Sequence, residues 1–137
     1  MDTARLKRYG DKLEIISKRM AEIEEWEEDF ADDEKTKLAC YKAFQEIVEA
    51  AMDVAAMVVK DAGTIPKDDY SNIDLIVGKK IISKNIAKRL IEANGLRNRV
   101  VHHYNGLKAK LAHDSMVELL PFFAEFVESV TKWLGRQ

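Results

Sequence analysis

The chain has 137 residues, of which 47% are apolar and 34% charged, with six Gly, two Pro and a single Cys. This composition fits one globular domain and excludes a collagen-like, disordered or disulfide-stapled chain. The net charge is −2, and no apolar stretch approaches the roughly 20 residues that a membrane span needs, so we expect a single domain over residues 1–137 in a soluble, cytoplasmic protein.

Apolar residues recur every three or four positions along most of the chain, which is typical of amphipathic helices. The pattern predicts a first helix over residues 6–30 and a second from residue 38 to residue 61. Gly63 can close the second helix in a left-handed conformation. Pro66 then disfavours helix at the preceding residue and predicts a loop over residues 64–70.

The second half of the chain continues the helical pattern. A third helical tract covers residues 70–77, resumes at residue 81, passes Asn94-Gly95 as a break or a weak kink, and continues through Tyr104. The last helix is expected to start at Asp114 or Ser115, because Glu118 would complete a capping box, and to bend before Pro121. No alternating segment suggests a strand. The sequence therefore predicts an all-α, up-and-down bundle of four to five helices.

The charges are unevenly distributed along the chain. Residues 22–34 hold nine acids and no base, whereas residues 79–110 hold nine bases and one acid, Glu92. A local positive field of this kind attracts polyanions such as RNA even when the net charge is slightly negative. A solvated face of a charged helical protein is the simpler interpretation of the same pattern.

The segment Leu96-Arg97-Asn98-Arg99-Val100-Val101-His102-His103-Tyr104 carries the side chains best suited to chemistry. On a helix, Arg97 and His102 differ by about 140° around the axis and about 7.5 Å along it, and a flexible arginine side chain can bridge that separation. Tyr104 would share the helix stripe of Arg97. The segment can therefore present a fixed cation, a titratable imidazole, an amide and a phenol in one patch.

Phosphodiester cleavage in RNA can use these groups. A guanidinium binds the non-bridging phosphate oxygens in a bidentate fork and stabilises their growing charge, and an imidazole exchanges protons near neutral pH. The 2′-hydroxyl is a built-in nucleophile, so this chemistry needs neither a metal nor another cofactor. His102, His103 and His113 lack the i, i+4 spacing of helical zinc ligands, and we predict no metal site.

Two acids interrupt the apolar face of the second predicted helix. Glu49 and Asp53 stand four residues apart, and acids in such a position usually answer a buried cation. We therefore expect Glu49 or Asp53 to orient Arg97 or His102.

Arg97-x4-His102-x-Tyr104 resembles the Arg-x4-6-His motif of HEPN domains, in the form found in HepT-like proteins. The similarity extends to Gly95-Leu-Arg-Asn-Arg-Val-Val-His102 and to the segment from Gln45 to Ala55, and it covers residues 5–134. The resemblance implies a dimeric helical toxin of the type VII HEPN/MNT toxin–antitoxin class, which cleaves RNA without a metal and is partnered by an MNT-type nucleotidyltransferase antitoxin.

Carried over by position, the resemblance assigns cleavage to Arg97 and His102, with Asn98 assisting. It also makes Tyr104 the residue that the antitoxin modifies by transfer of AMP (AMPylation). His103 stands where the family often has Gly or Glu, and with Arg99 it is predicted to bind RNA phosphates. Two alternatives remain at this stage, namely a non-catalytic RNA- or nucleotide-binding module that partners a nucleotidyltransferase, and a structural bundle.

Overall fold

A computed structural model describes all residues 1–137 as an all-helical bundle without strands. Its elements are α1 (Thr3–Trp26), the short 3₁₀ helix η1 (Glu27–Asp29), α2 (Glu34–Asp61), α3 (Asp69–Gly78), α4 (Lys84–His102), the 3₁₀ turn η2 (Tyr104–Gly106) and α5 (Ala109–Leu134). The predicted all-α bundle is confirmed. None of the helices combines the length and the apolarity that crossing a lipid bilayer requires.

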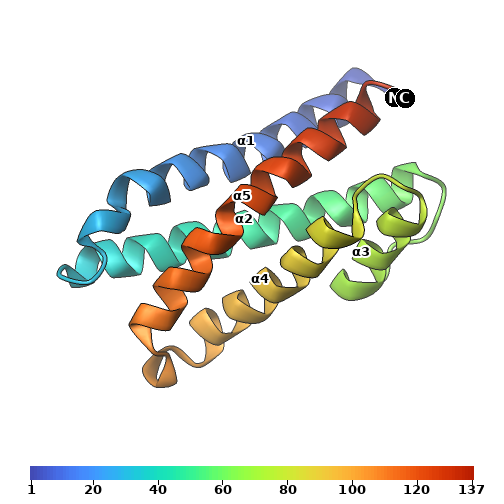
Figure 1. Ribbon diagram of the computed structural model, residues 1–137. Coiled ribbons are helices and arrows are strands. Elements are labelled where there is room, and N and C mark those ends of the chain that lie inside the picture. Colours follow the sequence, from blue (N-terminus) through green and yellow to red (C-terminus); the bar gives the residue numbers. More distant parts are fainter.

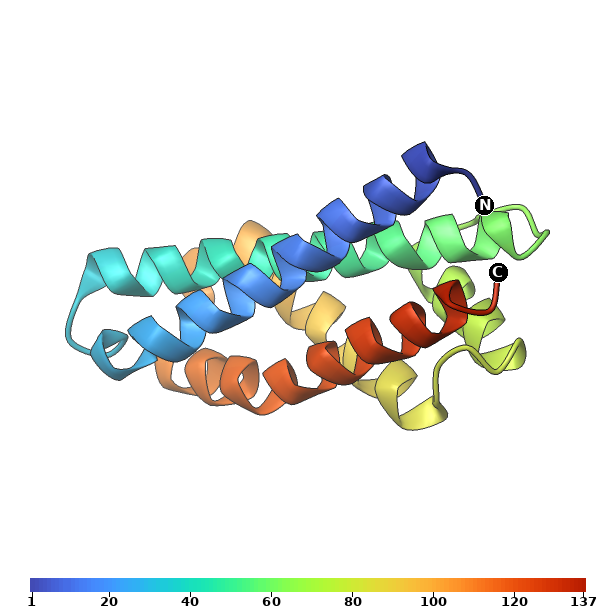
Figure 2. The same cartoon turned by 90° about the horizontal axis from the view of Figure 1, so that it is seen from above.

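The four long helices lie side by side, and the short α3 packs at one end of the bundle (Figures 1 and 2). Both chain termini lie at the α3 end, whereas the α1–α2 and α4–α5 connections lie at the opposite end (Figure 1). Helix α2 packs against α1, α3 and α4, and α5 packs against α1 and α4. The last turn of α4 and the η2 turn therefore lie beside the start of α2, far along the sequence from it.

Side-chain caps fix where most helices begin. Asp2, Asp33 and Asp68 each accept a hydrogen bond from the backbone N–H three residues later, and Ser83 caps α4 in the same way. Such caps satisfy backbone donors that the first helical turn leaves free. Helix α2 ends as predicted, because Gly63 adopts a positive φ of 92° directly after it.

The core is apolar and lies between α2 and the other helices. It includes a perpendicular pair of fully buried rings, Phe44 of α2 and Phe123 of α5, whose centroids are 6.3 Å apart. Near the termini, Asp61 accepts hydrogen bonds from the Arg5 guanidinium at 2.8 Å and the Tyr9 hydroxyl at 2.6 Å. Asn72 and Asn94 are the two buried polar residues, and both have hydrogen-bond partners.

The structure corrects two predicted helix boundaries. Helix α4 ends at His102, so Tyr104 lies in the separate turn η2 and not on the helix stripe of Arg97. Helix α5 begins at Ala109 without a side-chain cap, so Asp114 and Ser115 are interior residues and not its start. Of the two alternatives predicted at Asn94-Gly95 the break is absent, because α4 continues through these residues, and Pro121 lies inside the last helix as expected.

Candidate functional site

The end of helix α4 presents the motif side chains. Leu96 and Val100 are buried and fix the rotation of the helix against the core. Consequently Arg97 and Asn98 are half-buried, while Arg99, His102 and His103 are exposed. The buried apolar positions thus decide which motif residues face neighbouring helices and which face solvent.

Arg97 is held between helices α2, α3 and α4. Its Nη2 donates to Asn94 Oδ1 at 2.9 Å and lies 4.0 Å from Asp69 Oδ2, and its Nη1 lies 3.7 Å from Glu49 Oε1. Asn94 Nδ2 in turn reaches Asp69 Oδ2 at 3.5 Å, and Arg97 Nε is buried without a hydrogen-bond partner. Two carboxylates and one amide therefore fix the position of this guanidinium.

These contacts decide between the two predicted acidic partners. The expected contact between Glu49 and Arg97 is present. Asp53 does not take this role, because its carboxylate pairs with Lys12 Nζ of α1 at 2.8 Å. Asp53 lies about 40° further around α2 than Glu49, which turns it from α4 towards α1.

Sequence reasoning missed Asn94 and Asp69. Asn94 stands in the segment Asn94-Gly95, where the sequence predicts a break or a weak kink, and Asp69 lies inside the loop predicted over residues 64–70, although the structure makes it the first residue of α3. One signal in the sequence could have identified Asn94: it stands three residues before Arg97, and residues at this spacing lie on the same face of a helix.

His102 and His103 occupy the last turn and the C-cap of α4. No hydrogen bond or ion pair joins either imidazole, or the Asn98 amide, to another side chain, and none links Arg97 to His102. The structure thus brings Arg97 together with Glu49, while the convergence of Arg97 and His102 on one phosphate stays a prediction.

Tyr104 lies against the start of α2. Its hydroxyl donates to Glu34 Oε1 at 2.7 Å, and its ring meets Tyr41 edge-to-face with centroids 5.7 Å apart. The hydrogen bond to the Glu34 carboxylate raises the pKa of the Tyr104 phenol, because a nearby negative charge disfavours phenolate. With 37% of its surface exposed, Tyr104 is both oriented and accessible.

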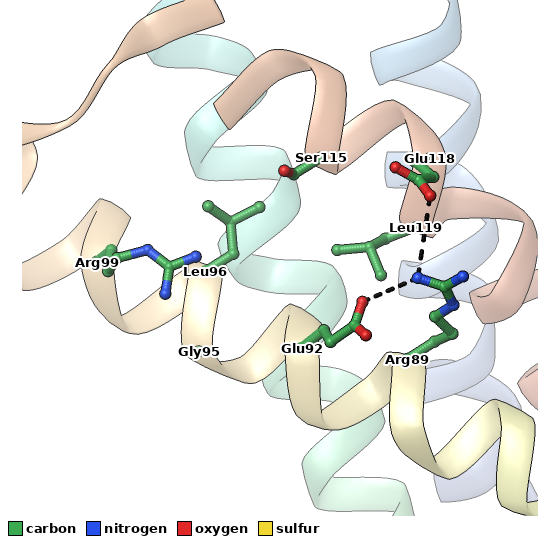
Figure 3. Close-up of a pocket in the computed structure, with 8 residues that line it drawn as sticks. All are labelled: Arg89, Glu92, Gly95, Leu96, Arg99, Ser115, Glu118 and Leu119. Atoms are coloured by element: carbon green, nitrogen blue, oxygen red, sulfur yellow. Dashed lines mark hydrogen bonds and ion pairs between the residues drawn. The ribbon is translucent and has the colours of Figure 1, made fainter. Parts of the chain in front are cut away.

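A hollow between α4 and α5 contains Arg89 at one end and Arg99 at the other (Figure 3). Arg89 pairs with Glu92 at 3.0 Å and lies 3.9 Å from Glu118. Arg99 has no ion pair in the structure, and no interaction is drawn to it or to Ser115 (Figure 3). The predicted phosphate-binding residue Arg99 therefore carries a positive charge that no carboxylate neutralises.

The third histidine lies apart from the motif pair. His113 Nε2 is 2.8 Å from Glu27 Oε2, and the imidazole packs on the Phe30 ring at 4.7 Å between centroids. No group of three or more His, Cys, Asp or Glu side chains is arranged to hold a metal ion.

Known proteins match the chain over nearly its whole length. The family model described as ribonuclease HepT-like matches residues 10–130. A protein of Archaeoglobus fulgidus named as a candidate RNase is 36% identical over 134 residues, covering 96% of this chain and 99% of the relative. A protein of Aphanizomenon flos-aquae named tRNA nuclease HepT is 22% identical over 130 residues, covering 90% and 87%.

Solved structures share the fold. The tri-AMPylated HEPN toxin of Shewanella oneidensis in complex with its MNT antitoxin superposes with a TM-score of 0.84 at 20% identity, covering 96% of this chain and 99% of that one. A cytosolic protein of unknown function, YutE of Bacillus subtilis, superposes with a TM-score of 0.81 at 14% identity, covering 93% and 89%.

Proposed function

Because the chain belongs to the ribonuclease HepT-like family, we propose that it is a metal-independent endoribonuclease toxin that cleaves RNA with Arg97 and His102. The observation that carries the proposal is the difference between the surroundings of Arg97 and those of His102 at the end of α4. Arg97 is fixed by Asn94, Glu49 and Asp69, while the His102 imidazole is exposed and has no competing partner. One group is positioned and the other is free to exchange a proton with substrate.

The proposed reaction is transesterification within the RNA strand. The 2′-hydroxyl oxygen attacks the adjacent phosphorus while His102 accepts its proton, the bond from phosphorus to the 5′ oxygen breaks, and a 2′,3′-cyclic phosphate forms. Arg97 stabilises the negative charge that grows on the non-bridging oxygens. The leaving 5′ oxygen takes up a proton and departs as a hydroxyl.

A symmetric dimer completes this proposal. Arg97 and His102 point about 140° apart around α4, and a second imidazole would protonate the leaving 5′ oxygen while His102 accepts the proton of the 2′-hydroxyl. Two motif copies that face one cleft across a two-fold axis would bring the Arg97 and the His102 of different copies together and would also supply the second imidazole. Sedimentation analysis at micromolar concentration is expected to give a dimer, and a strictly monomeric active enzyme would contradict this part.

We further propose that an MNT-type nucleotidyltransferase antitoxin neutralises the protein by AMPylation of Tyr104. The Tyr104 oxygen would form a bond to the α-phosphorus of ATP, pyrophosphate would leave, and Glu34 could accept the phenolic proton at 2.7 Å. The exposure of Tyr104 supports the proposal, as does the AMPylated state of the structurally similar Shewanella toxin. The added phosphate would bring negative charge next to the motif.

Cleavage of single-stranded RNA in EDTA tests the catalytic assignment. Wild-type protein is expected to cleave, His102→Ala and Arg97→Ala to be inactive, and Arg97→Lys to recover only part of the activity, because lysine cannot form the bidentate fork. Lys18→Ala on the exposed face of α1 is the matched control. Equal cleavage by wild type and His102→Ala would refute the assignment. RNA binding without cleavage by any variant would favour the non-catalytic module.

A further inference from the structure

Helix α4 places Arg99 on the side of the helix opposite Arg97. The two residues differ by about 200° around the axis, so Arg97 faces α2 and α3 whereas Arg99 faces α5. His102 follows Arg99 by three residues, which puts it about 60° around and about 4.5 Å along the helix from Arg99. The exposed imidazole of the proposed site is therefore a close surface neighbour of Arg99.

Two adjoining hollows between α4 and α5 share Leu96, Arg99 and Ser115. The first is the one in Figure 3, where Glu92 and Glu118 balance the charge of Arg89. The second continues towards the η2 turn and adds Lys108, Leu107 and Leu111 to its lining, with no carboxylate. Only the second hollow therefore combines two cations without an acid.

The cations of this second hollow are unpaired. Arg99 and Lys108 are exposed, and neither makes an ion pair, although most other arginines of the chain do. Two like charges beside one concave surface favour an anion between them. The Ser115 side chain adds a hydrogen-bond donor, and Leu111, with 61% of its surface exposed, adds an apolar wall.

This combination of groups matches one nucleotide of an RNA strand. Guanidinium and ammonium groups bind a backbone phosphate, and an apolar wall accepts the face of a ribose or base. The same side chains fit an acidic peptide less well, since they offer one anion site beside an apolar surface. The position next to His102 fits a nucleotide adjacent to the phosphate that is cleaved.

We propose that the hollow formed by Leu96, Arg99, Leu107, Lys108, Leu111 and Ser115 is an RNA subsite that binds the nucleotide beside the scissile phosphate. The proposal rests on the ribonuclease function proposed above and assigns the ground-state affinity for RNA to the α4–α5 face. Arg99 and Lys108 bind the backbone phosphate, Ser115 donates to it, and Leu111 contacts the nucleoside.

Binding of a fluorescent single-stranded 2′-O-methyl RNA in EDTA tests the subsite without any cleavage. Ser115→Glu places a carboxylate in the hollow, and Ser115→Gln is its uncharged match. We expect Ser115→Glu to bind RNA about tenfold more weakly than Ser115→Gln, which corresponds to the loss of one charge-assisted contact. Because both substitutions have the same size, equal loss in the two variants would overturn the electrostatic role.

The salt dependence of binding identifies the phosphate contacts. In the double variant Arg99→Ala/Lys108→Ala, the slope of log affinity against log salt is expected to fall by about 0.7, since each neutralised phosphate of a single strand contributes about 0.7. Lys18→Ala removes a positive charge from α1, which does not pack on α4, and should keep the wild-type slope. A double variant with the slope of Lys18→Ala would overturn the proposal.

The apolar wall has its own readout. Leu111→Ala should weaken RNA binding about threefold through lost apolar contact and leave the salt slope unchanged, and an unaltered affinity would remove the nucleoside contact from the proposal.

Separate experiments test the subsite and the ribonuclease function. Unmodified RNA that is cleaved equally by wild type and His102→Ala refutes the catalytic assignment, whereas the binding results with uncleavable RNA decide the subsite alone.

Discussion

Replacing Asn94 by alanine should destabilise the fold and disturb Arg97 at once. Asn94 is 3% exposed, and its Oδ1 accepts a 2.9 Å hydrogen bond from the charged Arg97 guanidinium. Hydrogen bonds to charged groups contribute about 1.5–3 kcal/mol. The 3.5 Å distance from Asn94 Nδ2 to Asp69 Oδ2 lies at the limit of a hydrogen bond, so we assign little stabilising free energy to this contact. The expected loss in the free energy of unfolding is therefore about 2 kcal/mol.

Urea denaturation of wild type and Asn94→Ala measures this loss. Asn98→Ala is the matched control, because Asn98 lies on the same helix and its side chain makes no hydrogen bond. That variant should stay within about 0.5 kcal/mol of wild type. A similar small effect for Asn94→Ala would refute the reasoning that Asn94 anchors Arg97. On the proposed function, Asn94→Ala should also lower RNA cleavage at saturating substrate, because a small displacement of a catalytic group can cost about a hundredfold in rate.

Three further predictions concern ionisation. Burial raises the pKa of Asp61, but its two hydrogen bonds outweigh burial and hold the pKa below its usual value. The ionised carboxylate therefore stabilises the folded protein at neutral pH, and this stabilisation is lost as pH falls below about 4. The urea midpoint of Asp61→Asn should accordingly depend less on pH between 5 and 3 than the midpoint of wild type. Glu34→Gln should lower the pKa of Tyr104, measured by NMR titration, and an unchanged pKa would contradict the role of the carboxylate. Burial raises the pKa of the Cys40 thiol to about 11, so a thiol reagent at pH 8 should react with Cys40 only as the protein unfolds. Rapid reaction with the folded protein would contradict the burial of this thiol.

The sequence predicted the helices better than their ends. Apolar periodicity identifies buried faces directly, which is why α2 and its end before Gly63 were found. The end of α4 depends on a tertiary contact, because the chain leaves the helix at His102 and turns so that Tyr104 reaches Glu34, seventy residues away. The start of α5 at Ala109 has no capping side chain, and the Ser115–Glu118 pair has the spacing of a cap but lies inside the helix.

The candidate site was predictable where one helix face determines the contact. An acid on the apolar face of α2 needs a cation, and Glu49 meets Arg97 as expected. Asp53 also meets a cation, but a rotation of about 40° directs it to Lys12 of another helix and away from Arg97. Which of several cations answers an acid depends on helix packing, and periodicity alone does not contain that information.

The two arginines of the motif region are suited to different stages of RNA cleavage. Arg97 shares its surroundings with Glu49 and Asp69, so an RNA phosphate in the ground state competes with two carboxylates for its donors. Arg99 has no such competitor. Binding energy accelerates a reaction only when it is stronger in the transition state than in the bound substrate. On the proposed function, Arg99 therefore holds the strand, and Arg97, already compensated by carboxylates, responds mainly to the additional charge on the phosphate as the bond breaks. Loss of Arg99 should then raise KM, whereas loss of Arg97 should lower kcat, and a reversal of these two effects would contradict this division of roles.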